Sequence, residues 1–195
     1  MHDLFGKKII LSETFENLTT LTREGWQIAM GEAEFCDHQA RDHGYEPGHG
    51  CQDKDTLRAH QIGQAGQMAC YGWAGLEWIS TEGDYNRPDM LGLFQIRTRS
   101  QAGQPMCCHP NDDDDWCMIC MEMTGKARQF RTVGFSMGRI CKREPLQALY
   151  GRPPQHWMPQ AKLEKDWRVL LRLIHARAED LGVPWQPLAK KIVSE

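Results

Sequence analysis

The sequence predicts a mixed α/β fold, and three observations support this prediction. Four short apolar segments in the centre of the chain are typical of β-strands, at residues 91–98, 106–109, 116–124 and 130–137. Three longer segments repeat apolar residues every three or four positions, as helices do, at residues 23–42, 57–78 and 162–181. The chain has 195 residues, enough for one well-buried core. We therefore expect a central mixed sheet of about four to five strands flanked by helices.

Helices dominate the first part of the chain, after a short strand expected at residues 8–11. Thr22 is a good N-cap for the helix over 23–42. Residues 44–55 are rich in Gly and charge and have no apolar period, so they are predicted to form a loop. The helix over 57–78 contains four glycines, and each disfavours a helix by up to about 1 kcal/mol relative to alanine. This pattern indicates that another backbone packs closely against that helix.

A hairpin and a terminal helix are predicted in the second half. Residues 125–128 join the last two strands as a hairpin. The helix over 162–181 has the strongest amphipathic pattern in the chain and is closed by Gly182 and then Pro184. Residues 150–159 contain three prolines and are predicted to be a linker that delivers this helix.

Composition and charge limit the class of protein. One domain is expected, with a core over residues 1–150 and a linker and C-terminal helix over residues 151–195 that pack on it. Hydrophobic residues make up 41%, charged residues 25% and the net charge is -3, which excludes a disordered tail and a globally basic nucleic-acid binder. No stretch approaches the roughly 18 apolar residues that span a bilayer, and the start has no apolar export segment. We expect a cytoplasmic protein without membrane contact, whose eight cysteines are reduced.

The best functional signal runs from Pro88-Asp89 to Gln95-Ile96-Arg97. Asp89 is placed where a turn leads into a strand. Gln95 and Arg97 are two positions apart, so they project to one face of that strand while Ile96 turns to the core. Metal-dependent phosphodiester hydrolysis needs oxygen ligands on a rigid frame and a cation that offsets phosphate charge. One acid, one amide oxygen and one guanidinium can converge here.

This segment resembles the signature of the PD-(D/E)xK nuclease superfamily, which places an Asp at the start of one strand, an acid or Gln ligand on the next, and a Lys two residues later. The resemblance implies a restriction-endonuclease-like fold. It also implies Mg²⁺ or Mn²⁺ bound by Asp89, Gln95 and the Ile96 carbonyl, with Arg97 stabilising phosphate charge. The family often adds a Glu from the preceding helix. The matching position here is Gln67, which is expected to position water.

The chain is more closely similar to a group of uncharacterised phage and prophage proteins. The matching motifs, in the same order and spacing, are Gly63 to Gln67, Pro88-Asp89, Gln95 to Arg97, His109 to Trp116, Met123 to Gly125 and Val133 to Phe135. They cover roughly residues 22–142. This resemblance implies a fold more firmly than an activity, and it places the chain in the cytoplasm of a bacterial host cell.

Departures from the nuclease pattern leave two functions open. Gln67 replaces the Glu of the family, and Arg97 replaces its Lys, so this position stabilises charge and does not accept a proton. The first function is a degenerate Mg²⁺-dependent nuclease, a hydrolase in which Asp89, Gln95, Arg97 and Gln67 are catalytic. The second is a non-catalytic phage protein that binds nucleic acid or a host defence protein. Without the resemblance, the favoured interpretation is that Asp89 is a turn residue beside a solvated edge strand. The resemblance brings the functional interpretation level with it.

Basic and acidic residues elsewhere have two interpretations each. Arg99, Lys126, Arg128 and Arg131 are predicted to contact nucleic acid from the strand region, although scattered cations on a sheet edge explain them equally well. The acidic run at residues 112–115 is predicted to be a solvated loop, because four consecutive carboxylates cannot all face one ion.

Zinc is the less favoured metal. Cys117 and Cys120 are three apart on a predicted strand, so they point to opposite faces and do not chelate one ion together. The remaining candidate ligands for a tetrahedral zinc site are Cys36, His38, His49 and Cys51.

Overall fold

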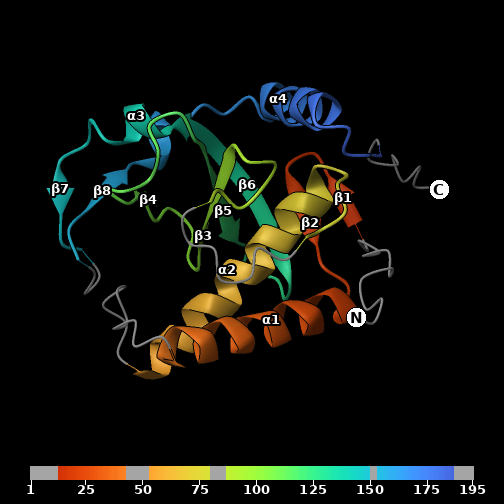
Figure 1. Cartoon of the computed structure of the whole chain (residues 1–195), viewed down its shortest axis with the longest axis horizontal. Helices are drawn as coiled ribbons and strands as arrows, with labels where there is room; N and C mark the ends of the chain where they lie inside the picture. The colour runs from red at the N-terminus through yellow and green to blue at the C-terminus, as the bar shows by residue number, and fades with distance from the viewer. Residues whose placement is uncertain (1–12, 43–52, 80–86, 150–152, 187–195) are drawn as a thin grey trace.

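A five-stranded sheet lies at the centre of the computed structural model, which describes residues 13–42, 53–79, 87–149 and 153–186 (Figure 1). The strand order is β1-β2-β6-β5-β3. The strands are β1 (Glu13–Phe15), β2 (Leu18–Thr20), β3 (Phe94–Arg99), β5 (Cys117–Met123) and β6 (Gln129–Met137). β3 runs parallel to β5, and the other neighbours are antiparallel. The predicted mixed sheet flanked by helices is therefore confirmed.

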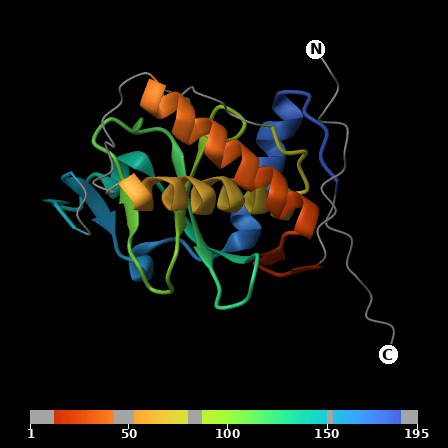
Figure 2. The ribbon, with the colours of Figure 1, turned by 90° about the horizontal axis from the view of Figure 1, so that it is seen from below.

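Two long helices cover one face of this sheet (Figure 2). α1 (Arg23–Asp42) has the predicted bounds and packs on α2 (Asp53–Trp73), which lies between α1 and the sheet. Thr22 caps α1 as predicted, because its Oγ1 accepts a hydrogen bond from Gly25 N at 3.0 Å. α2 begins before the predicted position and ends at Trp73 instead of residue 78. Gly75 follows with a φ of 73°, a left-handed conformation that ends helices.

The side chains of β5 alternate between two apolar cores. Cys117, Ile119 and Met121 belong to the larger core, which α2 also lines. Met118 and Cys120 belong to a smaller core on the opposite face of the strand. Cys117 and Cys120 therefore point to opposite faces, as predicted. All seven cysteines that the structure describes are free thiols.

Gly66 allows α2 to lie close against β3. A Cβ atom at this position would lie 1.9 Å from Thr98 Oγ1. We expect Gly66→Ala to lower the free energy of unfolding by about 1–3 kcal/mol, measured by urea denaturation, because the core is overpacked. Gly63→Ala on the same helix is the control, since its Cβ meets nothing within 4 Å, and it should raise stability by up to about 1 kcal/mol. Equal effects of the two substitutions would contradict this close packing.

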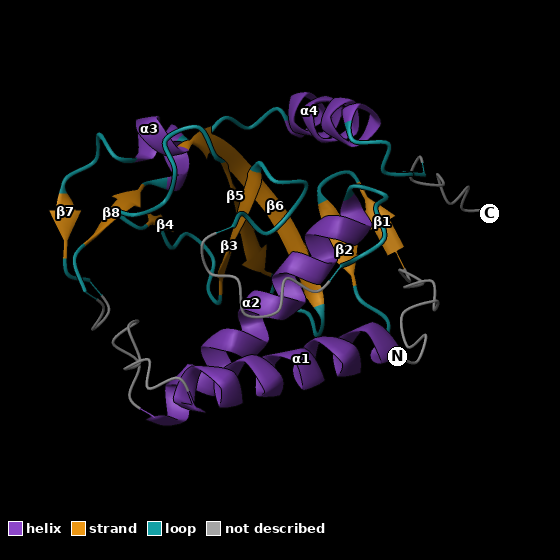
Figure 3. Ribbon diagram, in the orientation of Figure 1, coloured by secondary structure: helices purple, strands orange, loops and turns teal. Residues whose placement is uncertain are grey.

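A second sheet of three strands was not predicted (Figure 3). Its order is β4-β8-β7, with β4 (Met106–Cys108), β8 (Gln155–Met158) and β7 (Leu146–Gln147). β4 was predicted as a strand, but it pairs with β8 outside the central sheet. The linker prediction for residues 150–159 is wrong over β8. Prolines at both ends bound this strand, and none lies within it.

Two predicted boundaries are corrected by local backbone geometry. The strand predicted from residue 91 begins at Phe94, because Leu91 and Gly92 have φ values of 52° and 66° and form a turn. The helix predicted from residue 162 begins at Trp167, where the Asp166 side chain caps the first turn.

The C-terminal helix α4 (Trp167–Asp180) closes the larger core. A short 3-10 helix, η1 (Gln160–Lys162), precedes it, and Gly182 ends it with a φ of 66°, as predicted. The residues of α4 that are buried in the larger core are Leu170, Ile174 and Ala178.

The strand predicted over residues 8–11 and most of the loop predicted over residues 44–55 lie outside the described residues. Among the helices that are described, none is long and apolar enough to cross a membrane.

Candidate functional site

The turn before β3 places the Asp89 carboxylate against the outer edge of the sheet. Met90 and Phe94 exchange two backbone hydrogen bonds of 2.9 Å, which fold the chain back on itself. Because β3 is an edge strand, every second N–H points away from β5. The N–H of Ile96 is one of these, and it donates to Asp89 Oδ2 at 2.7 Å. The carboxylate therefore covers an edge position that would otherwise be open.

Two glutamine amides complete the surroundings of Asp89. Gln67 Nε2, from α2, donates to Oδ1 at 2.9 Å, and Gln95 Nε2 donates to Oδ2 at 2.7 Å. Tyr71, one helical turn beyond Gln67, donates its hydroxyl to the Asp89 carbonyl at 2.6 Å. The structure therefore brings together four of the residues predicted from sequence, Asp89, Gln67, Gln95 and Ile96. We call these four residues the Asp89 cluster.

The contacts within the Asp89 cluster differ in kind from the predicted ones. Ile96 was expected to offer its carbonyl oxygen to a metal, but its contact with Asp89 is made by its N–H. Gln95 was expected to offer its amide oxygen to a metal, but it instead directs its NH₂ group at Asp89 Oδ2. Three N–H donors around the Asp89 carboxylate stabilise its negative charge and disfavour a cation bound beside it.

Burial changes the acidity of Asp89. Asp89 is only 8% exposed. Loss of hydration raises the pKa of Asp89 from 3.8 to about 6, and the nearby Asp112 adds to this effect. The positive charge of Arg97 and the N–H of Ile96 act in the opposite direction but do not cancel it. Asp89 therefore titrates close to neutral pH.

Arg97 is held by a partner that sequence reasoning missed. Its Nη2 lies 2.6 Å from Asp112 Oδ1 and 2.8 Å from Oδ2, and the side chains are 19% and 8% exposed. Asp112 also accepts a hydrogen bond from His109 N at 2.7 Å. The prediction of a solvated acidic loop is thus wrong for Asp112, although residues 113–115 are exposed. No signal in the sequence separates Asp112 from the three acids that follow it.

The predicted nucleic-acid contacts divide into buried and exposed residues. Arg99 is buried, with its guanidinium carbon 5.4 Å from the centre of the Trp157 ring, so its prediction as a surface contact is wrong. Arg131 is exposed but forms an ion pair with the buried Glu122. Lys126 and Arg128 lie on the turn between β5 and β6, where the hairpin was predicted.

Among the described residues, the predicted metal ligands do not belong to a larger set of acidic, His or Cys side chains. Within the described parts of the chain, no group of three or more His, Cys, Asp and Glu residues is arranged to hold a metal ion. Of the zinc candidates, Cys36 is buried and His38 is exposed on α1, while His49 and Cys51 lie outside the described residues.

Comparison with known proteins gave no relative for this chain. No family model matches it, and neither the curated proteins nor the solved structures include a match.

Proposed function

We propose that this chain is a catalytically silent, nuclease-like protein that binds nucleic acid without cleaving it. The observation that carries this proposal is the environment of Asp89. Both of its oxygens accept hydrogen bonds from N–H groups, at 2.7 to 2.9 Å. Both carboxylate oxygens that a divalent cation would use therefore already accept hydrogen bonds from N–H donors.

The Asp89 cluster does not fit a resident Mg²⁺ ion. Mg²⁺ requires oxygen ligands in near-octahedral geometry, and it is usually held by one or two carboxylates and several waters. The Gln67 and Gln95 amides can turn to present oxygen, but the Ile96 N–H is fixed by its strand and points at Asp89 Oδ2. Arg97, the predicted phosphate contact, is instead bound to Asp112. These contacts favour binding over hydrolysis.

Nucleic acid is expected to contact the turn between β5 and β6. Lys126 and Arg128 are two residues apart on this turn, and neither makes an ion pair with another described residue. Lys126 is exposed and Arg128 is half-buried. The side chain of Arg131 is 45% exposed on the strand that follows. We call these three residues the hairpin cations. Contacts of this kind bind phosphate without reading sequence.

The catalytic part of the proposal is tested with supercoiled plasmid and divalent metal. We expect no nicking in Mg²⁺ or Mn²⁺ by the wild type, and the same result for Asp89→Ala. Calorimetric titration of Mn²⁺ should give no binding heat with either protein. Nicking that requires metal and disappears in Asp89→Ala would contradict the proposal and establish the degenerate nuclease in its place.

The binding part is tested with a labelled oligonucleotide in EDTA. Lys126→Ala combined with Arg128→Ala should weaken binding and reduce the slope of log affinity against log salt by about one for each lost cation. Arg172→Ala is a matched control, because Arg172 is exposed on α4, away from the turn. If no oligonucleotide binds, or if the double variant binds like the wild type, nucleic acid is the wrong partner and a host protein is the remaining alternative.

A further inference from the structure

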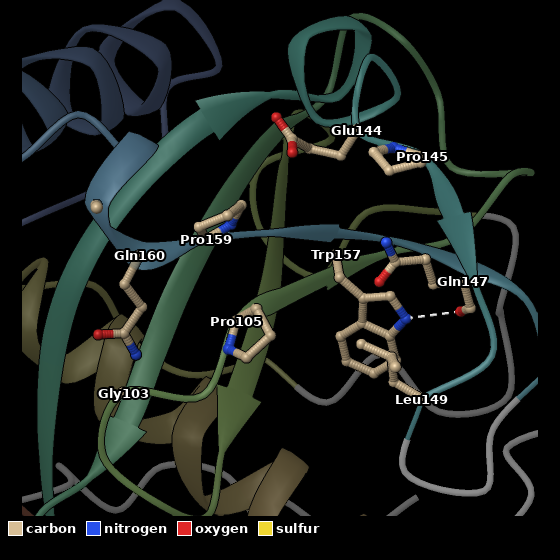
Figure 4. Close-up of a pocket in the computed structure, with 10 residues that line it drawn as sticks. Gly103, Pro105, Glu144, Pro145, Gln147, Leu149, Trp157, Pro159 and Gln160 are labelled. Carbon is tan, nitrogen blue, oxygen red and sulfur yellow. Dashed lines mark hydrogen bonds between the residues drawn. The ribbon is translucent and has the colours of Figure 1, made fainter.

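A pocket of about 490 Å³ opens beside the smaller sheet (Figure 4), and no residue of the Asp89 cluster lines it. Its walls come from the loop after β3, from β7 and β8, and from η1. Pro105, Leu149 and the Trp157 ring lie together at its centre. Pro145 and Pro159 also line it. The lining is therefore largely apolar.

A shared carboxylate places this pocket next to the hairpin cations. Glu122 Oε2 accepts hydrogen bonds of 2.9 Å from Gly103 N and from Gln160 Nε2, and both of these residues line the pocket. Glu122 also pairs with Arg131, which faces it across the β5–β6 ladder. Just beyond Glu122, the chain enters the turn that carries Lys126 and Arg128. One end of the central sheet therefore carries both the pocket and the cations.

The charges around the pocket suit an anionic polymer. Glu144 lines the pocket, and Glu122 lies behind the lining residues Gly103 and Gln160. Each carboxylate is bound by a cation, Lys162 for Glu144 and Arg131 for Glu122. Beneath the floor, the guanidinium of Arg99 lies against the Trp157 ring. The negative charges are thus compensated, and a positive charge backs the aromatic surface.

We propose that this pocket receives one unstacked base of a single-stranded nucleic acid whose phosphates contact the hairpin cations. The inference rests on the proposed function and specifies its substrate class. Bases of a single strand are free to leave the stack and enter a recess, whereas those of a duplex are paired and stacked. Proline and leucine side chains pack against the faces of the base, and Trp157 lies at the bottom.

Gln147 is the side chain that contacts the edge of the base. It is exposed at the rim of the pocket, and its amide carries both a donor and an acceptor (Figure 4). The Trp157 indole N–H is already donated to the Gln147 carbonyl at 2.8 Å, so it does not contribute. One amide at the rim gives weak discrimination among bases, and we expect little sequence preference.

The test compares a short fluorescein-labelled oligothymidylate with the same strand carrying abasic sites, which keep the phosphates and lose the bases. Fluorescence anisotropy should show about tenfold weaker binding of the abasic strand, because this strand has no base to fill the pocket. Ala161→Phe adds bulk at an exposed position of the pocket rim. It should lower the affinity for the intact strand to that of the abasic strand and leave abasic binding unchanged.

Ala176→Phe is the matched control, since Ala176 is exposed on α4, and it should bind both strands like the wild type. Equal affinity for the intact and abasic strands, with no effect of Ala161→Phe, would overturn the base pocket and leave the proposed function standing. Failure of both strands to bind the wild type would overturn the proposed function together with the pocket.

Discussion

Asp112→Ala should lower the free energy of unfolding by about 3–5 kcal/mol, the range seen when one partner of a buried ion pair is removed. Arg97 would keep its charge in a site where it is 19% exposed and would lose the only ion pair seen for it among the described residues. The N–H of His109 would also lose its acceptor. Urea denaturation of the variant and the wild type measures this difference.

Two further variants separate charge from loop structure. Asp115→Ala removes an exposed ion pair with Arg139 in the same acidic loop, and it should change stability by less than about 1 kcal/mol. Combining Asp112→Leu with Arg97→Met removes both charges, so this pair of changes should restore much of the stability lost in Asp112→Ala. If Asp112→Ala and Asp115→Ala are equally stable, the buried pair is not important for the fold.

The fold was predictable where local pattern and tertiary structure agree. α1 has a good N-cap and a regular apolar side, and its bounds match the prediction. β5 and β6 are long apolar segments joined by a short turn, and they also match closely. β8 was missed because prolines surround a strand of four residues, and its partner β4 lies far away in sequence. Pairing between such short, distant segments depends on the packed core and leaves no local pattern.

The meeting of Asp89, Gln67 and Gln95 was predictable from the family resemblance, but the direction of their hydrogen bonds was not. Ile96 N–H points outward because β3 is the edge of the sheet, which depends on strand order. The pairing of Arg97 with Asp112 depends on where the loop after β4 folds back. A cation and an acid separated by fifteen positions carry no sequence signal for their contact.

The stability of the protein should depend on pH through Asp89. The pKa of this buried carboxyl is raised to about 6 in the folded chain, mainly by loss of hydration, against an ordinary value of 3.8. The folded state thus binds the proton more tightly than the unfolded state. The resulting stabilisation is fully present below about pH 4 and is lost as pH rises through 6, a difference of about 3 kcal/mol at about 1.4 kcal/mol per pH unit.

Asp89→Asn provides the reference, because it keeps the size of the side chain and cannot titrate. We expect the free energy of unfolding of the wild type, relative to this variant, to fall by about 3 kcal/mol between pH 4 and pH 7. The Gln67 and Gln95 amides suit both protonation states, since each can donate to the carboxylate or turn to accept from the acid. A relative stability that rises with pH would show that the three N–H donors and Arg97 outweigh burial, and that Asp89 is a permanently charged group at the edge of the sheet.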